Sequence, residues 1–370
     1  MSEPNSSLFI GLMSGTSLDG VDGVLVRLPD TDGAPMQIIA SSHLPFKAEI
    51  RSQGLALQQN GHDEIHREAL FANAITQVYA NCVTQLMAIS GEEKVCAIGV
   101  HGQTIRHRPE LGYTRQTNNP ALLAELTGID VIADFRSRDV AAGGQGAPLV
   151  PAFHRAIFAR AGQCRVVVNI GGISNISVLH ADGSTIGFDT GPGNVLMDAW
   201  IEKHQAKTYD ADGAWAKQGI VNQDLLTRLN QEEFLRMPPP KSTGRDLFRL
   251  GWLAQILQDF ASVSPVDVQA TLCAFTAKTI ADQIRQYAVD VTEIYVCGGG
   301  VLNSTLMHNL GLELPQVPVK STAELGVAPE QVEALAFAWL AQRFVQRRAG
   351  NLAEVTGARG ERILGALYPA

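Results

Sequence analysis

Apolar residues form short and long runs along the chain, and the two kinds predict different elements. Short runs of strand length occur at residues 8–13, 95–100, 131–133, 165–170, 176–179 and 294–297. Residues 62–89 carry apolar side chains every three or four positions, which predicts a helix whose buried face contains Ile65, Leu70, Ala74, Ile75, Val78, Cys82 and Leu86. Residues 120–126 and 330–347 predict further helices. Strands that alternate with helices indicate α/β layers.

The first apolar run leads into a turn rich in glycine and hydroxyl residues. Residues 8–28 predict a hairpin, and its turn consists of Ser14, Gly15, Thr16, Ser17, Leu18, Asp19 and Gly20. Glycines let backbone N–H groups approach a ligand closely, and hydroxyl groups add donors. Such a turn can hold a phosphate, and Asp19 or Asp22 could hold its magnesium. The alternative is an ordinary glycine-rich hairpin turn.

Two later strands end in comparable turns. Residues 165–170 run into Gly171 and Gly172 and out through a second apolar run, and residues 294–297 end in Gly298–Gly300. Two phosphate-binding hairpins from separate domains, with a glycine turn for the adenosine, are the plan of the actin/hexokinase-type superfamily. The alternative is ordinary glycine turns, although α/β proteins bind ligands at such strand ends. A Walker-type loop, a dinucleotide fingerprint and a hydrolase nucleophile elbow are missing from the sequence.

A carboxylate in a rigid turn follows the second hairpin. Asp189 ends a short apolar approach and enters a turn with Gly191, Pro192 and Gly193. A carboxylate held there could act as a general base. The alternative is an Asx-turn residue that caps Gly191. Asp198, nearby in a predicted helix, is interpreted as a surface charge.

Two basic segments offer binding groups. Arg136 and Arg138 stand beside Asp134 and Asp139 at a strand end. Arginine binds carboxylate and phosphate with two hydrogen bonds, but an internal ion-pair network is equally compatible with the pattern.

Histidines occur in two places. His101 and His107 could line a polar substrate pocket or belong to a packed loop. His62 and His66 have a spacing that can bind zinc, but a solvated helix start explains them better.

Length, charge and cysteine content narrow the class of protein. With 370 residues the chain exceeds one core, and we expect an N-terminal domain at 1–140 and a C-terminal domain at 141–370, with the C-terminal helix packing back on the first. A net charge of −8 without a basic block disfavours nucleic acid. Neither a membrane-spanning run nor a signal peptide is predicted. Cysteines without a CxxC pair suggest a reducing cytoplasm.

Long, specific motifs extend nearly from one end of the chain to the other. They occupy residues 11–22, 101–104, 139–151, 169–172, 187–200, 241–245, 296–300, 333–339, 355–357 and 364–366. Together they resemble the bacterial anhydro-N-acetylmuramic acid kinase family. Residues 114–119 depart from the usual family pattern, which affects the expected substrate contacts. Ser137 stands where a third arginine is common, and the family has no histidines matching His62 and His66.

The resemblance implies an α/β fold of two actin-like (ribonuclease H-like) domains around a nucleotide cleft. It also implies a homodimer, ATP and Mg²⁺ as cofactors, and a role in cell-wall recycling. The implied reaction converts 1,6-anhydro-N-acetylmuramate, ATP and water into N-acetylmuramate 6-phosphate and ADP. Asp189 matches the catalytic aspartate. The expected ATP-binding residues are Gly15, Thr16, Ser17, Leu18, Asp19, Gly20, Val21, Asp22, Gly171, Gly172, Gly298, Gly299 and Gly300.

The expected sugar-binding residues are Ser14, His101, Arg138 and Glu333, and Asp19 is expected to hold Mg²⁺ directly or through water. Two rival functions remain at this point. One is a kinase of the same superfamily that phosphorylates an open hydroxyl of a plain hexose without consuming water. The other is a non-catalytic nucleotide switch, such as an assembly or chaperone module, in which the Asp189 turn has no evident use.

Overall fold

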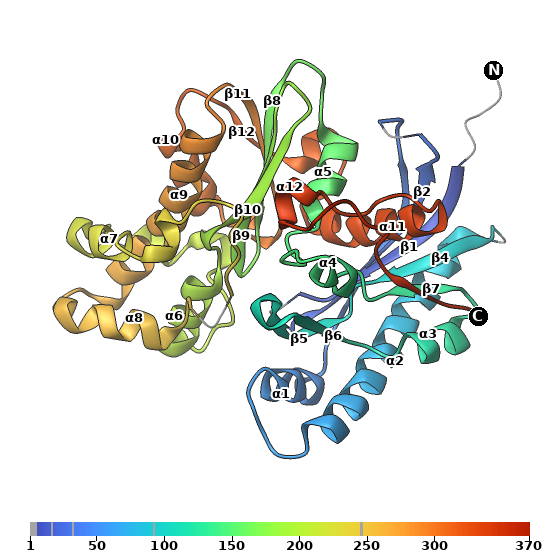
Figure 1. Cartoon of the computed structure of the whole chain (residues 1–370). Coiled ribbons are helices and arrows are strands. Elements are labelled where there is room, and N and C mark those ends of the chain that lie inside the picture. The colour runs from blue at the N-terminus through green and yellow to red at the C-terminus, as the bar shows by residue number, and fades with distance from the viewer. Residues whose placement is uncertain (1–5, 16–17, 32, 92, 245–246) are drawn as a thin grey trace. The chain divides into compact units, whose positions relative to one another are not determined.

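The chain folds into two compact units, each built around its own sheet. The computed structural model describes residues 6–15, 18–31, 33–91, 93–244 and 247–370 (Figure 1). Unit 1 comprises Met1–Ile157 and Gln331–Ala370, and unit 2 comprises Phe158–Glu330. This division differs from the expected boundary at 140/141, because residues 141–157 belong to unit 1; the C-terminal segment, whose helix was expected to pack back on the first domain, also belongs to unit 1. Among the described residues, no helix combines the length and apolar character needed to cross a membrane.

Unit 1 contains a mixed sheet with the strand order β13-β7-β4-β1-β2-β3. Its strands are β1 (Ser6–Met13), β2 (Gly20–Pro29), β3 (Gln37–Pro45), β4 (Val95–Val100), β7 (Val131–Ala133) and β13 (Ala366–Tyr368). The first three form an antiparallel meander, and β4 and β7 continue the sheet parallel to β1. A separate ribbon pairs β5 (Gln103–Arg108) with β6 (Tyr113–Thr117). The predicted hairpin at 8–28 is confirmed.

Helices cover both faces of the unit 1 sheet. They are α1 (Ala48–Leu57), α2 (Glu64–Ser90), α3 (Pro120–Thr127), α4 (Ser137–Ala141), α5 (Val150–Phe158), α11 (Val332–Val345) and α12 (Ala353–Thr356). The predicted buried face of α2 is wrong at its start, since Ile65 and Leu70 are 88% and 56% exposed. The helix packs on the sheet only further along, through Ile75, Cys82 and Leu86.

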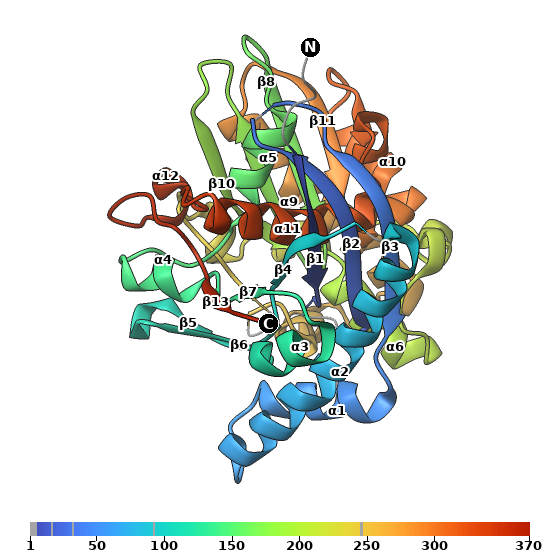
Figure 2. The same cartoon turned by 90° about the vertical axis from the view of Figure 1, so that its right-hand side faces the viewer.

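Helix α11 lies against β1 and β4, on the face of the sheet opposite α2 (Figure 2). The close approach depends on two glycines. A Cβ at Gly11 would lie 1.8 Å from the Ala334 carbonyl oxygen, and one at Gly99 would lie 2.0 Å from that of Phe337. Because only glycine leaves room for helix backbone there, the C-terminal helix belongs to unit 1.

Unit 2 repeats this topology in a five-stranded sheet. Its strands are β8 (Cys164–Ile170), β9 (Ile173–Leu179), β10 (Thr185–Pro192), β11 (Val291–Cys297) and β12 (Val319–Ser321), in the order β10-β9-β8-β11-β12. Again the first three strands form an antiparallel meander, and the last two run parallel to the first. The repeated topology confirms the α/β fold class with two actin-like units.

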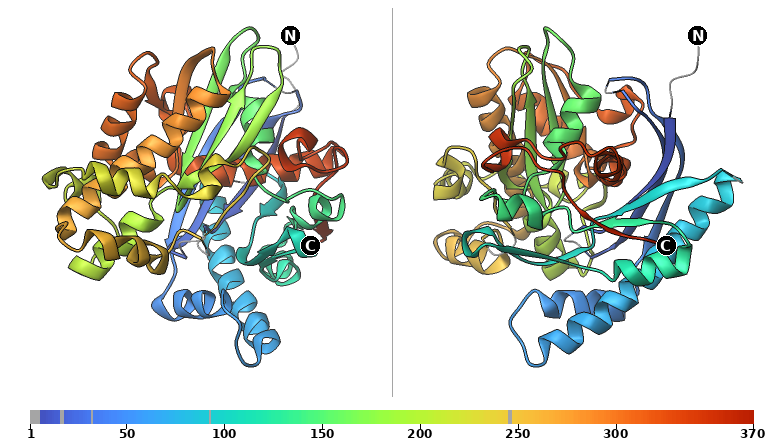
Figure 3. Two further views of the ribbon diagram at one scale, coloured as in Figure 1. Left: turned by 60° about the vertical axis from the view of Figure 1, so that its left-hand side comes forward. Right: turned by 45° about the vertical axis from the view of Figure 1, so that its right-hand side comes forward.

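The unit 2 helices are α6 (Val195–Gln205), α7 (Gln223–Leu229), α8 (Leu250–Ile256), α9 (Pro265–Tyr287) and α10 (Ser304–Glu313). Helices α9 and α10, in orange in the left view of Figure 3, lie on one side of the green strands. They bury the inner sheet residues Val168, Ile176 and Phe188 in one apolar core. Helix α10 begins directly after Asn303, whose side chain caps it by accepting the Leu306 N–H at 2.9 Å.

Candidate functional site

In unit 2 the predicted glycine turns gather at one edge of the sheet. Strands β8 and β11 are parallel, so their carboxyl ends lie together, and β10 ends at the same edge as β8. Gly172 accepts the Gly193 N–H at 2.9 Å through its carbonyl oxygen, and Gly171 accepts the Asn194 N–H at 2.8 Å in the same way. The structure therefore brings the 171–172 turn against the loop that opens α6.

Close backbone packing explains why glycines stand in these turns. A Cβ at Gly193 would lie 2.2 Å from the Gly171 carbonyl oxygen. Gly298 has a φ of 79°, and a Cβ there would lie 2.4 Å from Asn169 Oδ1. The 171–172 turn lies beside the N-terminus of α6, whose dipole favours anions, while the Gly193, Asn194 and Val195 N–H groups donate to the carbonyls of that turn.

Asp189 lies near the end of β10, which is an edge strand of the sheet. Its backbone N–H donates to the Lys241 carbonyl at 3.2 Å, and its carboxylate Oδ2 accepts the Thr243 N–H at 2.9 Å. The 241–243 segment thus covers the exposed edge of β10 and fixes both the backbone and the side chain of Asp189. A half-buried carboxylate held in one orientation can accept a proton from a neighbouring molecule.

Two asparagines lie in register with Asp189 on the neighbouring strands, and neither was predicted from the sequence to have a role. Asn175 pairs with Asp189 across β9 and β10, and Asn169 pairs with Asn175 across β8 and β9. Asn175 Oδ1 is buried and has no hydrogen-bond partner among the described residues. The sequence signal for these two asparagines was that each is a polar residue in an apolar strand next to a glycine turn. Only the strand register shows that they lie beside Asp189.

In unit 1 the structure describes part of the N-terminal turn. The Ser14 hydroxyl is buried, 2.6 Å from the Tyr79 hydroxyl, and the Gly15 carbonyl accepts from Gln103 Nε2 at 3.0 Å. Leu18 is buried with a φ of 56°, and Val21 is a core residue. Thr16 and Ser17 lie outside the described residues. The turn is therefore fixed at both ends by core contacts.

The two aspartates of this hairpin have different surroundings. Asp19 is exposed, and its Oδ1 accepts the Gly20 N–H at 2.9 Å. Asp22 Oδ1 lies 2.8 Å from His43 Nδ1. Among the described residues, no group of three or more acidic, histidine or cysteine side chains could hold a metal ion. Mg²⁺ commonly takes one protein carboxylate and completes its shell with phosphate and water, so Asp19 fits that ion.

His101, predicted to bind sugar, is buried and held by an arginine. Arg136 Nε donates to His101 Nε2 at 3.0 Å, and the Phe337 ring lies 4.7 Å from the imidazole. Burial, and then the positive charge of Arg136, lower the pKa of His101 well below its ordinary value. The ring is therefore neutral, and because arginine can only donate, the imidazole proton resides on Nδ1.

The other predicted residues of unit 1 are less constrained. Arg138 is exposed on α4, and Glu333 is half-buried in the first turn of α11. His62 and His66 are exposed at the start of α2.

Asp139, by contrast, is fully buried and accepts from Gly146 N, Asn351 Nδ2 and Thr356 Oγ1 at 2.8, 2.6 and 2.8 Å. These contacts tie the 139–146 segment to the C-terminal segment.

The repeated sheets and their glycine turns define the class, a two-unit α/β protein of the actin-like type. The sequence model of the anhydro-N-acetylmuramic acid kinases matches residues 7–370. The chain is 55% identical over 379 residues to the anhydro-N-acetylmuramic acid kinase of Cupriavidus metallidurans, covering 100% of this chain and 99% of that one. It is also 55% identical over 373 residues to that of Burkholderia lata, covering 99% and 97%. The chain belongs to the anhydro-N-acetylmuramic acid kinase family.

Among solved structures, the chain is similar to the activator of the 2-hydroxyisocaproyl-CoA dehydratase from Clostridium difficile with bound ADPNP. The TM-score is 0.47 with 12% identity, over 92% of this chain and 96% of that chain. A glucokinase of the ROK family from Streptomyces griseus gives a TM-score of 0.43 with 12% identity, over 91% and 100%.

Proposed function

We propose that this protein is an ATP-dependent kinase that opens 1,6-anhydro-N-acetylmuramate with water and phosphorylates O6. The products are N-acetylmuramate 6-phosphate and ADP, and the reaction recycles cell-wall sugar. Family membership over residues 7–370 supports the assignment. The observation that carries it is the Asp189 carboxylate, held by the Thr243 N–H at the edge where the glycine turns meet.

In unit 2 we assign Asp189 as the general base. We assign the turn at Gly171 and Gly172 to the phosphate oxygens, and the dipole of α6 adds to the attraction, since the Gly193, Asn194 and Val195 N–H groups already donate to the carbonyls of this turn. We assign Gly298–Gly300 to the adenosine side of ATP, as the family resemblance implies.

In unit 1 we assign residues 15–22, including Thr16 and Ser17, to the phosphates of ATP. Asp19 holds Mg²⁺, directly or through water, and the bound ion neutralises phosphate charge. His101, Arg138 and Glu333 bind the sugar. Ser14, expected to bind the sugar, is buried, and we assign it instead to fixing the start of the turn through its hydrogen bond to Tyr79.

The chemistry combines ring opening with phosphoryl transfer. Water attacks the anomeric carbon while Asp189 accepts its proton, and the bond from that carbon to O6 breaks. The electron pair stays on O6, which bonds to the γ-phosphorus as ADP leaves. The first half resembles an inverting glycosidase, with phosphoryl transfer in place of the usual general acid. Catalysis then depends on holding the water, sugar and phosphate in line.

The same proposal includes the location of the protein in the cell and its oligomeric state. ATP and a recycled sugar meet in the cytoplasm, and the cysteines, which are all free thiols, support that location. We also propose a homodimer, supported by the family resemblance; the apolar segment 330–347, expected to take part in it, is instead buried against the sheet of its own unit. Sedimentation of the purified protein tests the proposed homodimer.

Sugar-dependent ADP release tests the proposed function. Wild type and Asp189→Asn are compared with 1,6-anhydro-N-acetylmuramate as substrate, and ATP binding is measured for both. We expect strong turnover that the substitution abolishes while ATP still binds. In ¹⁸O-water the label should enter at the anomeric carbon. Turnover of a plain hexose without label would instead identify an ordinary sugar kinase, and ATP binding without sugar-stimulated turnover would identify a nucleotide switch.

A further inference from the structure

A lysine beside the proposed base is almost completely buried. Lys241 is 4% exposed, although lysines are rarely buried without partners. Its Nζ donates to the carbonyl oxygens of Phe234 and Leu235, each at 3.2 Å. It also lies 5.5 Å from the ring centroid of Phe188 and 5.0 Å from that of Phe234. The ammonium group therefore occupies a built site of two carbonyls and two aromatic faces.

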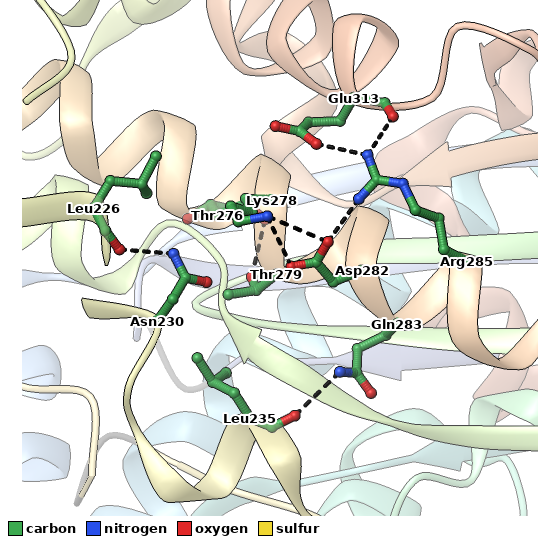
Figure 4. Close-up of polar contacts among 10 residues, drawn as sticks. All are labelled: Leu226, Asn230, Leu235, Thr276, Lys278, Thr279, Asp282, Gln283, Arg285 and Glu313. Carbon is green, nitrogen blue, oxygen red and sulfur yellow. Dashed lines mark hydrogen bonds and ion pairs between the residues drawn. The ribbon is translucent and has the colours of Figure 1, made fainter. Parts of the chain in front are cut away.

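This site is anchored to the helical side of unit 2. The two carbonyls belong to the short 3-10 helix Glu233–Arg236. The Leu235 carbonyl also accepts Gln283 Nε2 at 3.1 Å, from the buried face of α9 (Figure 4). On the same helix, Lys278, Asp282 and Arg285 form surface ion pairs away from this contact. The Leu235 carbonyl, which accepts from Lys241, is thus held both by its own 3-10 helix and by the contact with α9.

The same segment holds Asp189. The Lys241 carbonyl accepts the Asp189 N–H, and two residues later the Thr243 N–H donates to Asp189 Oδ2. Phe188, directly before the base, contributes one of the aromatic faces under the ammonium. Lys241 thereby fixes in the core the segment that orients the carboxylate.

The charge of Lys241 is coupled to Asp189. Burial lowers the pKa of Lys241 to about 8, and the negative charge of Asp189 acts in the opposite direction. Among the described residues, the neighbours of the ammonium group from other elements are neutral: the rings of Phe188 and Phe234, the two carbonyls and, beside the Leu235 carbonyl, Gln283. Glu232, next to the 3-10 helix, directs its carboxylate to Trp252 Nε1 at 2.8 Å.

We propose that Lys241 is a positioning residue for Asp189: its ammonium group locks the 241–243 segment against the core so that the Thr243 N–H aims the carboxylate. The inference rests on the proposed role of Asp189 as the base. Loss of the Lys241 proton removes one donor and the charge, so the segment loosens and the base loses its orientation. The turnover number falls, while the KM for ATP stays the same.

The test compares Lys241→Met and Lys241→Arg with Lys278→Met, a matched loss of a lysine in the same unit. Because misplacing a catalytic group by about 1 Å costs on the order of a hundredfold, we expect a kcat loss of about that size in Lys241→Met. Wild-type kcat should fall above a pH of about 8, and because arginine keeps the charge, Lys241→Arg should retain more activity than Lys241→Met and lack that fall. Lys278→Met should behave as wild type. Thermal unfolding and ATP binding check that each variant is folded.

A second measurement does not depend on activity. The ¹³Cε resonance of Lys241, assigned by its loss in Lys241→Arg, should titrate near pH 8, and Asp189→Asn should lower that midpoint. A midpoint near the ordinary lysine value, or one that Asp189→Asn leaves unchanged, overturns the proposal. So does wild-type kcat in folded Lys241→Met. A wild type without sugar-dependent turnover would instead overturn the proposed function, and the titration would still report the link between the two residues.

Discussion

The β1–β2 hairpin of unit 1 and the β8–β9 hairpin of unit 2 occupy the same place in the two sheets. Residues 14–19 connect the first pair, whereas only Gly171 and Gly172 connect the second. The longer turn carries hydroxyl groups and Asp19, and the shorter one offers backbone alone. The same topology thus carries two kinds of turn. The turn of unit 1 supplies side chains that can bind a ligand, whereas the turn of unit 2 packs closely against the loop beside it.

A carboxylate also lies near the turn end of each sheet, in different surroundings. Asp22 in β2 faces His43 at 2.8 Å, and its side chain is 40% exposed. Asp189 in β10 is half-buried and receives a backbone N–H from the segment that covers the strand edge. A backbone donor holds a carboxylate more firmly than a mobile, exposed side chain does. The comparison therefore favours Asp189 as the group with a fixed direction.

The largest expected effect separates these two carboxylates. Asp189→Asn should lower kcat by about a thousandfold, since general base catalysis contributes about 10²–10⁴. Asp22→Asn should change kcat less than about tenfold, because it removes an exposed pair that contributes about 0–1 kcal/mol, and its place in the proposed ATP-binding turn should appear in the KM for ATP instead. Coupled ADP release with the anhydro sugar measures both. Equal losses in the two variants would show that the fixed backbone donor is not what distinguishes them.

The next effect contrasts a glycine of each hairpin. Gly11→Ala should destabilise the protein by about 3 kcal/mol, because the new Cβ meets helix backbone that cannot move aside. Gly171→Ala is the matched substitution in unit 2, where the nearest atom to the new Cβ is the Ile173 carbonyl oxygen at an ordinary 3.6 Å. Urea unfolding measures both. A stable Gly11→Ala protein would mean that α11 tolerates a greater distance from β1.

These glycines also show which features of the structure could be predicted from the sequence. Strand length, helical periodicity and glycine position predicted the two hairpins and the turn at 298–300, which are local features. The sequence predicted that the C-terminal helix packs on the first domain but not which strand it contacts, because Gly11 and Ala334 are distant in sequence and meet only in the fold. For the same reason Asn175 and Lys241 went unassigned, since their roles depend on strand register and on a loop that returns to an edge.

Acid should act mainly on unit 1, which contains the buried histidines His101 and His154. Burial lowers the pKa of His154 to about 3. The unfolded chain binds this proton below pH of about 6.5 and the folded chain does not, so stability falls as the pH drops below that value. His204 and His308 of unit 2 are exposed.

For His154 alone the loss between pH 7 and pH 5 should be about 2 kcal/mol. Urea unfolding at the two pH values compares wild type with His154→Leu, which keeps an apolar group beside Phe153. The variant should lose less stability on acidification, and His308→Leu should behave as wild type. If His154→Leu lost as much as wild type, His154 would already be protonated, or exposed, in the folded protein.

The smallest effect tests the polar row beside Asp189. Asn175 Oδ1 is buried next to the proposed base, where it can accept the second proton of the attacking water and so turn a lone pair of the water toward the sugar. Asn175→Ala should therefore lower kcat about fivefold, in keeping with the loss of one hydrogen bond of about 1 kcal/mol. The control is Ser42→Ala in the third strand of unit 1, where only an exposed hydrogen bond to Gln85 is lost. The KM for ATP should stay constant in both variants, because water is the group that loses its partner. A rise in that KM with unchanged kcat would place Asn175 on the nucleotide side and leave the water held by Asp189 alone.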